Sequence, residues 1–236
     1  MTPSCSKLLP LRLITVFSLL IFATASGAEK DTTSKERAAL TGASHFQKVC
    51  ANCHGEKGEG KKELMAPSIA AMPDWYIETQ IEKYKEDQRG TKPTDAAGAT
   101  MHAVASTLDA KAVQQLAAYI DQLPIIPTRN TLGGDPRLGE EVYADTCMEC
   151  HRFNGRGEPF FRSAQLIGLP DWYIVRQLKN FRDGVRGSDV EDEEGQKMHR
   201  VTMHMDDKTI KSLAAHIAVL AEKYSKEESR ARLRRE

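Results

Sequence analysis

Apolar residues recur with the spacing of a helix along most of the chain, and no segment alternates like a strand. The clearest apolar stripe occurs twice and repeats at intervals of three, four and seven residues. Its members are Val113, Leu116, Ala117 and Ile120, then Ile210, Leu213, Ala214 and Ile217. A helix with such a stripe packs one face against a core. The pattern therefore predicts an all-α protein.

Aspartates mark where several of these helices begin, because an aspartate side chain can cap the free N–H groups of a first turn. Asp109 and Asp206 stand just before the two striped helices, and Asp74 and Asp171 open another helix in each half. At Asp135 a proline follows, in the position that the first helical turn favours.

The other helix boundaries come from weaker signals. The helices that begin at Asp74 and at its counterpart should end near the Arg-Gly pairs 89–90 and 186–187. A further helix, residues 34–49, should lead into the first cysteine motif, and its counterpart begins at Asp135.

The two halves of the chain are copies of one another, displaced by 97 residues from Cys50 to Cys147. Segment 73–77 (Pro-Asp-Trp-Tyr-Ile) returns as segment 170–174 and takes both tryptophans with it. Polar positions repeat too, because Gln80 corresponds to Gln177. We therefore expect two similar domains.

Residues 1–28 have the pattern of a secretory signal peptide. Lys7 and Arg12 precede an eleven-residue apolar run at 13–23, and small residues at 25–28 suit cleavage after Ala28. The run is short for a membrane span, which needs about 20 residues, although its retention as an anchor stays open. We expect an exported, periplasmic protein, either free or held at the membrane surface.

Proline and glycine at residues 124–134 make a natural linker between the two copies. The expected domains are therefore residues 29–126 and residues 127–236. The last twelve residues, 225–236, form a charged tail that we expect to be a solvated, frayed helix end.

Charge and composition narrow the class of protein. Lysine plus arginine and aspartate plus glutamate number 33 each, so the chain lacks the basic surface that general nucleic-acid binding needs. The mean hydropathy of −0.48 excludes a polytopic membrane protein. Aromatic residues make up only 6%, which suggests that something other than side chains fills part of the interior.

The four cysteines beyond residue 28 fall in two Cys-x-x-Cys-His motifs. These are Cys50, Cys53 and His54, and Cys147, Cys150 and His151. In such a motif two thiols attach haem c as thioethers, and the histidine after them binds the iron. A redox dithiol or half of a zinc site is the alternative. Two copies without a spare cysteine favour two covalent haem c groups.

A methionine follows each motif at the same distance, since Met101 and Met198 each lie 47 residues after the motif histidine. A thioether sulfur is a soft ligand suited to ferrous haem, and it raises the reduction potential. We expect these methionines to be the second axial ligands. His102 and His199, one residue further on, are the rival ligands, and a core position is the other alternative.

The chain resembles the cytochrome c4 family of exported di-haem cytochromes, which are built of two class I cytochrome c domains. The resemblance rests on the paired motifs, segments 75–81 and 172–178, segment 181–186 and the two methionines. It implies six-coordinate haems with histidine and methionine ligands, propionates that meet at the domain interface, and electron donation to a terminal oxidase.

Two departures from the repeat bear on function. In the superfamily a proline carbonyl commonly accepts the proximal histidine's N–H. Pro67 fits that role, whereas its counterpart is Ala164, so we expect the two haems to differ in potential. The acidic run 189–194 replaces residues 91–97 of the first half, and it is either a solvated loop or a docking patch for a basic redox partner.

The leading functional hypothesis is a single-electron carrier with no catalytic residues of its own. Its expected partners are a membrane quinol–cytochrome c reductase, a terminal oxidase or another periplasmic oxidoreductase. The alternatives are the cytochrome subunit of a larger oxidoreductase complex and a di-haem peroxidase-like enzyme, which needs one iron with an open coordination position.

Overall fold

The computed structural model describes residues 41–233, with side chains as far as Tyr224. This part of the chain is helical and holds no strand, only two isolated β-bridges at Lys61–Ala66 and Glu158–Ser163. The all-α prediction is confirmed. The α-helices are α2 (Ala51–His54), α3 (Asp74–Lys85), α4 (Ala96–Ala105), α5 (Ala110–Gln122), α6 (Pro136–Val142), α7 (Met148–His151), α8 (Asp171–Arg182), α9 (Glu193–Thr202) and α10 (Asp207–Leu233).

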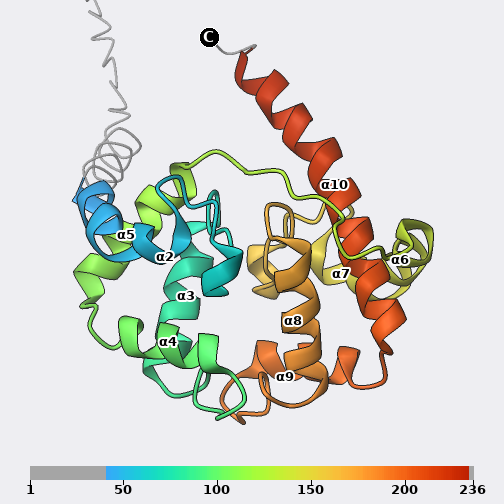
Figure 1. Cartoon of the computed structure of the whole chain (residues 1–236), viewed down its shortest axis with the longest axis horizontal. Coiled ribbons are helices and arrows are strands. Elements are labelled where there is room, and N and C mark those ends of the chain that lie inside the picture. The colour runs from blue at the N-terminus through green and yellow to red at the C-terminus, as the bar shows by residue number, and fades with distance from the viewer. Residues whose placement is uncertain (1–40, 234–236) are drawn as a thin grey trace, which may run out of the picture.

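The two halves lie side by side, with α2 to α5 in one and α6 to α10 in the other (Figure 1). Each half has its own hydrophobic core, and every residue of the two predicted stripes is buried in α5 or α10. An aromatic ring from the segment before each motif completes the core. Phe46 packs on Tyr119 and Tyr143 on His216, with ring centroids 5.3 Å and 5.2 Å apart.

A glycine lets two helices cross closely in each half. A Cβ on Gly42 would lie 1.9 Å from the Gln115 carbonyl oxygen of α5, and one on Gly139 would lie 1.9 Å from that of Ser212 in α10. Any larger residue would force the helices apart. The repeated glycines therefore fix how each motif segment meets the terminal helix of its own half.

The predicted helix starts agree with the structure, but two predicted ends are wrong by about one turn. Asp109, Asp135 and Asp206 each accept a hydrogen bond from a first-turn N–H. Helix α3 ends at Lys85 and α8 at Arg182, because Asp87 and Gly184 adopt left-handed φ angles of 61° and 66° that an α-helix cannot contain. The start predicted at residue 34 lies outside the described residues.

Helices α4 and α9 have no predicted counterpart, since these segments are rich in small and polar residues and lack an apolar stripe. Asp95 accepts a hydrogen bond from the Gly98 N–H at 3.0 Å and Asp192 one from the Gly195 N–H at 2.9 Å. These caps start two ten-residue helices, which carry the two methionines of interest.

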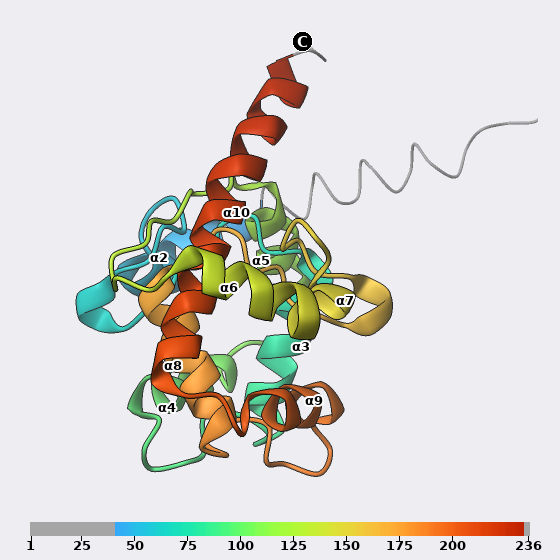
Figure 2. The same ribbon diagram turned by 90° about the vertical axis from the view of Figure 1, so that its right-hand side faces the viewer.

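Residues 124–134 form no helix, as the sequence predicted. The Asp171 carboxylate at the start of α8 accepts bonds from the Thr131 N–H and hydroxyl, and these fasten the linker to the second half. Helix α10 runs on well past the rest of the fold (Figure 2). Within residues 41–233, every helix is too short or too polar to cross a membrane.

Candidate haem-binding sites

Each cysteine motif lies where a π-helical turn runs directly into one turn of α-helix. The π-helical turns are η1 (Phe46–Cys50) and η3 (Tyr143–Cys147), followed by α2 and α7. The first residue of each π-helical turn is the buried core aromatic described above. The core therefore fixes the position from which the thiols and the histidine project.

The first thiol of each motif is buried in a setting that disfavours its thiolate form. Burial, with a smaller effect of the neighbouring cysteine, raises the pKa of Cys50 to about 11 and that of Cys147 to about 12. In redox-active dithiols the pKa of the attacking thiol is instead depressed. The burial of Cys50 and Cys147 therefore disfavours the dithiol alternative.

The motif histidines are buried and oriented, and their burial favours the neutral ring. His54 Nδ1 donates to the Pro67 carbonyl at 2.8 Å, and His151 Nδ1 donates to the Ala164 carbonyl at 2.9 Å. Burial lowers the pKa of both histidines, and the carbonyl bonds offset this only in part. With Nδ1 protonated, the neutral ring offers the Nε2 lone pair, which is the form that binds a metal.

The replacement of Pro67 by alanine in the second half does not change this loop. Both copies close with a β-bridge and turn through a left-handed residue, Met65 at φ 55° and Arg162 at φ 50°. The two histidine–carbonyl bonds differ in length by only 0.1 Å (2.9 against 2.8 Å). The proline-to-alanine change thus gives no structural ground for different potentials.

Met101 and Met198 face the same cavity as the motif histidines, whereas the rival histidines do not line it. His102 Nε2 pairs with the Asp87 carboxylate at 2.7 Å, and His199 Nδ1 bonds the Phe181 carbonyl at 2.5 Å. Both rings are thus engaged outside the cavity, which leaves the methionines as the better placed ligands.

The cavity measures about 340 Å³ and has walls from both halves. All eight residues predicted for the two sites line it: Cys50, Cys53, His54, Met101, Cys147, Cys150, His151 and Met198. Two sets of donors, each of two thiols, an imidazole and a thioether, thus open onto the same cavity. Covalent haem c attachment needs two thiols and a histidine, so the residues present fit two such groups, and each thioether is a suitable further iron ligand.

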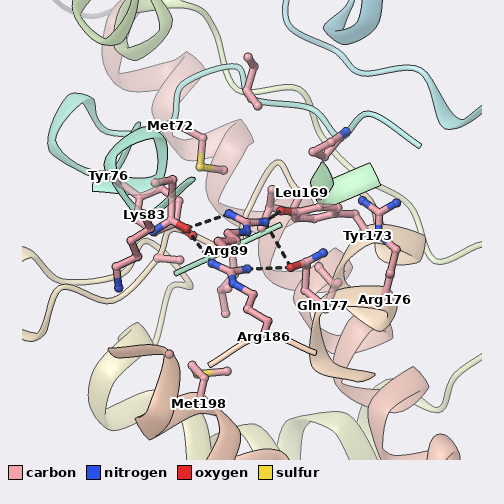
Figure 3. A pocket seen from close by; sticks show the side chains of 18 of the residues that line it. Met72, Tyr76, Lys83, Arg89, Leu169, Tyr173, Arg176, Gln177, Arg186 and Met198 are labelled. Carbon is pink, nitrogen blue, oxygen red and sulfur yellow. Dashed lines mark hydrogen bonds between the residues drawn. The ribbon is translucent and has the colours of Figure 1, made fainter. Parts of the chain in front are cut away.

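Two arginines meet in the middle of the cavity wall (Figure 3). Arg89 donates to Gln80 of its own half at 2.8 Å and to Tyr173 of the other at 3.0 Å. Arg186 donates to Gln177 at 2.8 Å and across the interface to Gln80 at 2.7 Å. This arginine–glutamine cluster (Gln80, Arg89, Gln177, Arg186) joins the two halves.

The guanidinium charges of the cluster lack a protein counter-charge. Arg89 lies over the Tyr84 ring and Arg186 over the Phe181 ring, each at 4.5 Å, and both arginines are buried. Neither forms an ion pair with a carboxylate of the described chain, and each Nε is buried without a hydrogen-bond acceptor. Buried charge of this kind demands an anionic partner. The repeat in the sequence relates Gln80 to Gln177, but it carries no sign that these side chains form a cluster.

The acidic run 189–194 is neither wholly solvated nor wholly free for docking. Asp192 is buried and forms an ion pair with Lys83 of the first half. Glu194 pairs with Lys83 at 2.6 Å and with Arg162 at 2.9 Å. Part of the run is thus an inter-domain contact, which the sequence interpretation missed.

Comparison with known proteins agrees with this geometry. The cytochrome c family model matches twice in tandem, at residues 39–124 and 137–221. The chain is 28% identical to the cbb3-type cytochrome c oxidase subunit CcoP of Azospirillum brasilense, over 75% of this chain and 60% of that subunit. The match therefore spans less than two thirds of that relative.

Two other relatives are covered more fully. The thiosulfate dehydrogenase electron acceptor of Thiomonas intermedia is 29% identical, over 72% of this chain and 77% of that protein. Cytochrome c4 of Azotobacter vinelandii is 28% identical, over 72% of this chain and 83% of that protein.

Among solved structures, reduced cytochrome c4 from Pseudomonas stutzeri superposes with a TM-score of 0.61 at 25% identity. The superposition covers 76% of this chain and 97% of that one. The tandem domains, the paired motifs and these matches lead to one assignment. The chain belongs to the cytochrome c family, as a di-haem member of the cytochrome c4 type that binds two haem c groups covalently.

Proposed function

We propose that this protein is a periplasmic electron carrier in which each haem iron is held between a histidine and a methionine. His54 and Met101 serve the first haem, and His151 and Met198 serve the second. The observation that carries the proposal is that both methionines line the cavity of the motif histidines, while His102 and His199 are bonded elsewhere.

The chain's own residues attach, orient and shield the cofactor. Cys50 and Cys53 would anchor the first haem and Cys147 and Cys150 the second, while the carbonyl bonds at Nδ1 fix each imidazole plane. Haem supplies one-electron redox chemistry when it is bound. Methionine ligation leaves no coordination position free for a substrate, so the proposed role is a carrier and not an enzyme.

The arginine–glutamine cluster is the proposed partner of the haem propionates. Arg89 and Arg186 are buried cations without a carboxylate partner, and they line the cavity between the two donor sets. Carboxylates at this place would balance their charge and satisfy the Nε atoms. The cluster thus joins the two halves where they line one cavity, and there it would bind the propionates of both haems.

The names of two relatives indicate which kind of redox partner to propose. One relative is named as an electron acceptor of thiosulfate dehydrogenase and another as an oxidase subunit. We propose a redox protein partner of that general kind, either an oxidase, a quinol–cytochrome c reductase or a dehydrogenase. The proposed signal at residues 1–28 lies outside the described residues, and domains of 29–126 and 127–236 stay predictions.

The deciding experiment compares ferric and ferrous absorption spectra of the purified holoprotein with and without carbon monoxide. Wild type should show the weak far-red ferric band of methionine–iron bonds and should bind carbon monoxide slowly. Met101→Ala and Met198→Ala should each remove about half of the band and open one haem to rapid binding. Rapid binding by wild type would instead support the peroxidase-like alternative.

A second candidate role, the cytochrome subunit of a larger oxidoreductase, is favoured by the match to CcoP. Gel filtration of the native protein from membranes and from the periplasmic fraction separates the two roles. A free carrier elutes at the size of a single chain, which is 26.3 kDa when residues 1–28 are included, whereas a subunit co-elutes with its complex.

A further inference from the structure

Lys83 makes a buried connection from the first half to the second. It lies near the C-terminal end of α3, and its side chain is only 10% exposed. Its ammonium donates to the Asp192 carboxylate and, at 2.6 Å, to that of Glu194. Arg162 closes the group by an ion pair with Glu194 at 2.9 Å.

Asp192 also caps a helix, and this cap connects the ion pair to the second haem site. Its carboxylate caps α9 through the Gly195 N–H, and α9 is the helix that carries Met198. Lys83 therefore bonds the residue that fixes the first turn of the methionine helix. Lys83, Asp192 and Glu194 all line the same cavity as Met198.

The first half has no such connection, although the backbone is repeated. The counterpart of Lys83 is Asn180, whose side-chain nitrogen is buried and has no hydrogen-bond partner. Asp95 caps α4 as Asp192 caps α9, and no residue of the second half forms an ion pair with it in the described chain. The clasp is therefore one-sided.

From this asymmetry we infer that Lys83, Asp192 and Glu194 form an inter-domain clasp that positions α9, holds Met198 against the second iron and raises that haem's potential. The inference rests on the proposed methionine ligation. Lys83 is a positioning residue, since it acts through Asp192 and the helix. The clasp also gives the two haems different potentials, for which the carbonyl bonds of the two histidines offer no reason.

The charges of the clasp predict in which direction the reduction potential of the second haem changes when Lys83 is replaced. Lys83 and Arg162 balance Asp192 and Glu194, so the intact clasp is neutral. Without the Lys83 charge, the two carboxylates would leave one net negative charge in the cavity wall at the start of α9, which would favour the ferric state of the haem that Met198 is proposed to bind. The reduction potential of that haem should fall, and the buried, unpaired Asp192 should loosen the start of α9.

The test uses Lys83→Gln in the full-length holoprotein, with both midpoint potentials and carbon monoxide binding as readouts. We expect a lower potential for the second haem only, and a roughly tenfold larger fraction of it open to carbon monoxide, the order of one lost charge-assisted hydrogen bond. Lys83→Arg should restore both properties. Lys85→Gln is the matched control, because Lys85 Nζ bonds the Leu108 carbonyl of its own half at 3.1 Å.

A second variant covers the case in which Lys83→Gln fails to mature. Asp192→Asn keeps a good helix cap but removes the charge partner, so it should also open the second haem. Equal shifts of both potentials, or no change in carbon monoxide binding in either variant, would overturn the clasp. Failure of the ligand assignment would show separately, as a Met198→Ala protein with an unchanged far-red band.

Discussion

Arg89 and Arg186, one from each half, donate to the same amide oxygen of Gln80, at 2.8 Å and 2.7 Å. Two buried cations so placed repel one another, and the aromatic rings beneath them supply only part of the compensation. The proposed haem propionates would supply the rest, so the contribution of the cluster to stability should depend on the bound haems.

The first prediction follows for Arg89→Ala in the holoprotein. The change should lower the free energy of unfolding by about 1–3 kcal/mol, because Tyr173 and Gln80 lose a buried donor. It should also lower both haem potentials, since Arg89 contacts both halves. Denaturant titration and potentiometry measure the two effects.

Arg182→Ala is the control for that experiment. Arg182 pairs with Asp183 and Asp207 at 2.8 Å, and more than half of each aspartate side chain is exposed. Such pairs contribute about 0–1 kcal/mol. An Arg89 variant that is no less stable than Arg182→Ala would contradict the role given to the cluster.

The second prediction concerns the helix crossings. Gly139→Ala should destabilise the second domain by about 1–3 kcal/mol or more, because its Cβ would meet the Ser212 carbonyl at 1.9 Å. Thermal unfolding followed at the haem absorption measures the loss. Glu141→Ala, an exposed change on the same helix, should stay near wild type, and equal stability of both variants would argue against the crossing.

The third prediction is a pH dependence that comes from Glu194. Burial raises the pKa of this carboxyl, but the hydrogen bond and charge of Lys83, with Arg162, outweigh burial and hold the pKa below its ordinary 4.5. Because the folded-state pKa is the lower one, the contribution to the free energy of unfolding is complete above pH 4.5. It is lost as the pH falls towards the folded-state value.

Urea titrations of wild type and Glu194→Gln between about pH 6 and about pH 3 test this sign. The stability advantage of wild type should shrink as the solution becomes more acidic. A difference that stays constant or grows on acidification would show that Glu194 is not stabilised as a carboxylate.

The fourth prediction concerns the carbonyl acceptors of the two histidines. Ala164→Pro should leave both haem potentials unchanged, because the Ala164 carbonyl already accepts the His151 bond at 2.9 Å in the same loop shape as Pro67. Potentiometric titration is the measurement, with Pro67→Ala as the reciprocal variant. A shifted haem potential in either variant would show that the proline–alanine difference does contribute to the difference between the two potentials.

Local and repeated signals in the sequence were enough for the fold and the donor residues. Asp109 and Asp206 gave helix starts, the stripes gave the core, and the cysteine motifs gave two haem groups. The ends of α3 and α8 were less accessible, because left-handed residues such as Asp87 carry no strong sequence signal. Helices α4 and α9 lacked an apolar stripe and depend on single aspartate caps.

Contacts between the halves were the part that sequence reasoning could not supply. The repeat showed that Gln80 and Gln177 correspond. It did not show that Arg186 of the second half donates a hydrogen bond to Gln80 of the first. Lys83 and Asp192 are 109 residues apart, and only the packing of the two domains brings them together. The acidic run consequently looked like a surface feature.

The shared cavity wall also makes each half of the duplicated chain depend on the other. A chain cut within the linker 124–134 would give two halves that each carry a complete set of thiols, imidazole and thioether. Each half alone would nevertheless expose a guanidinium that the intact protein keeps from water, and the second would also lose its lysine tether. These contacts therefore couple the two copies, and we expect each half alone to be less stable than the same half in the intact protein.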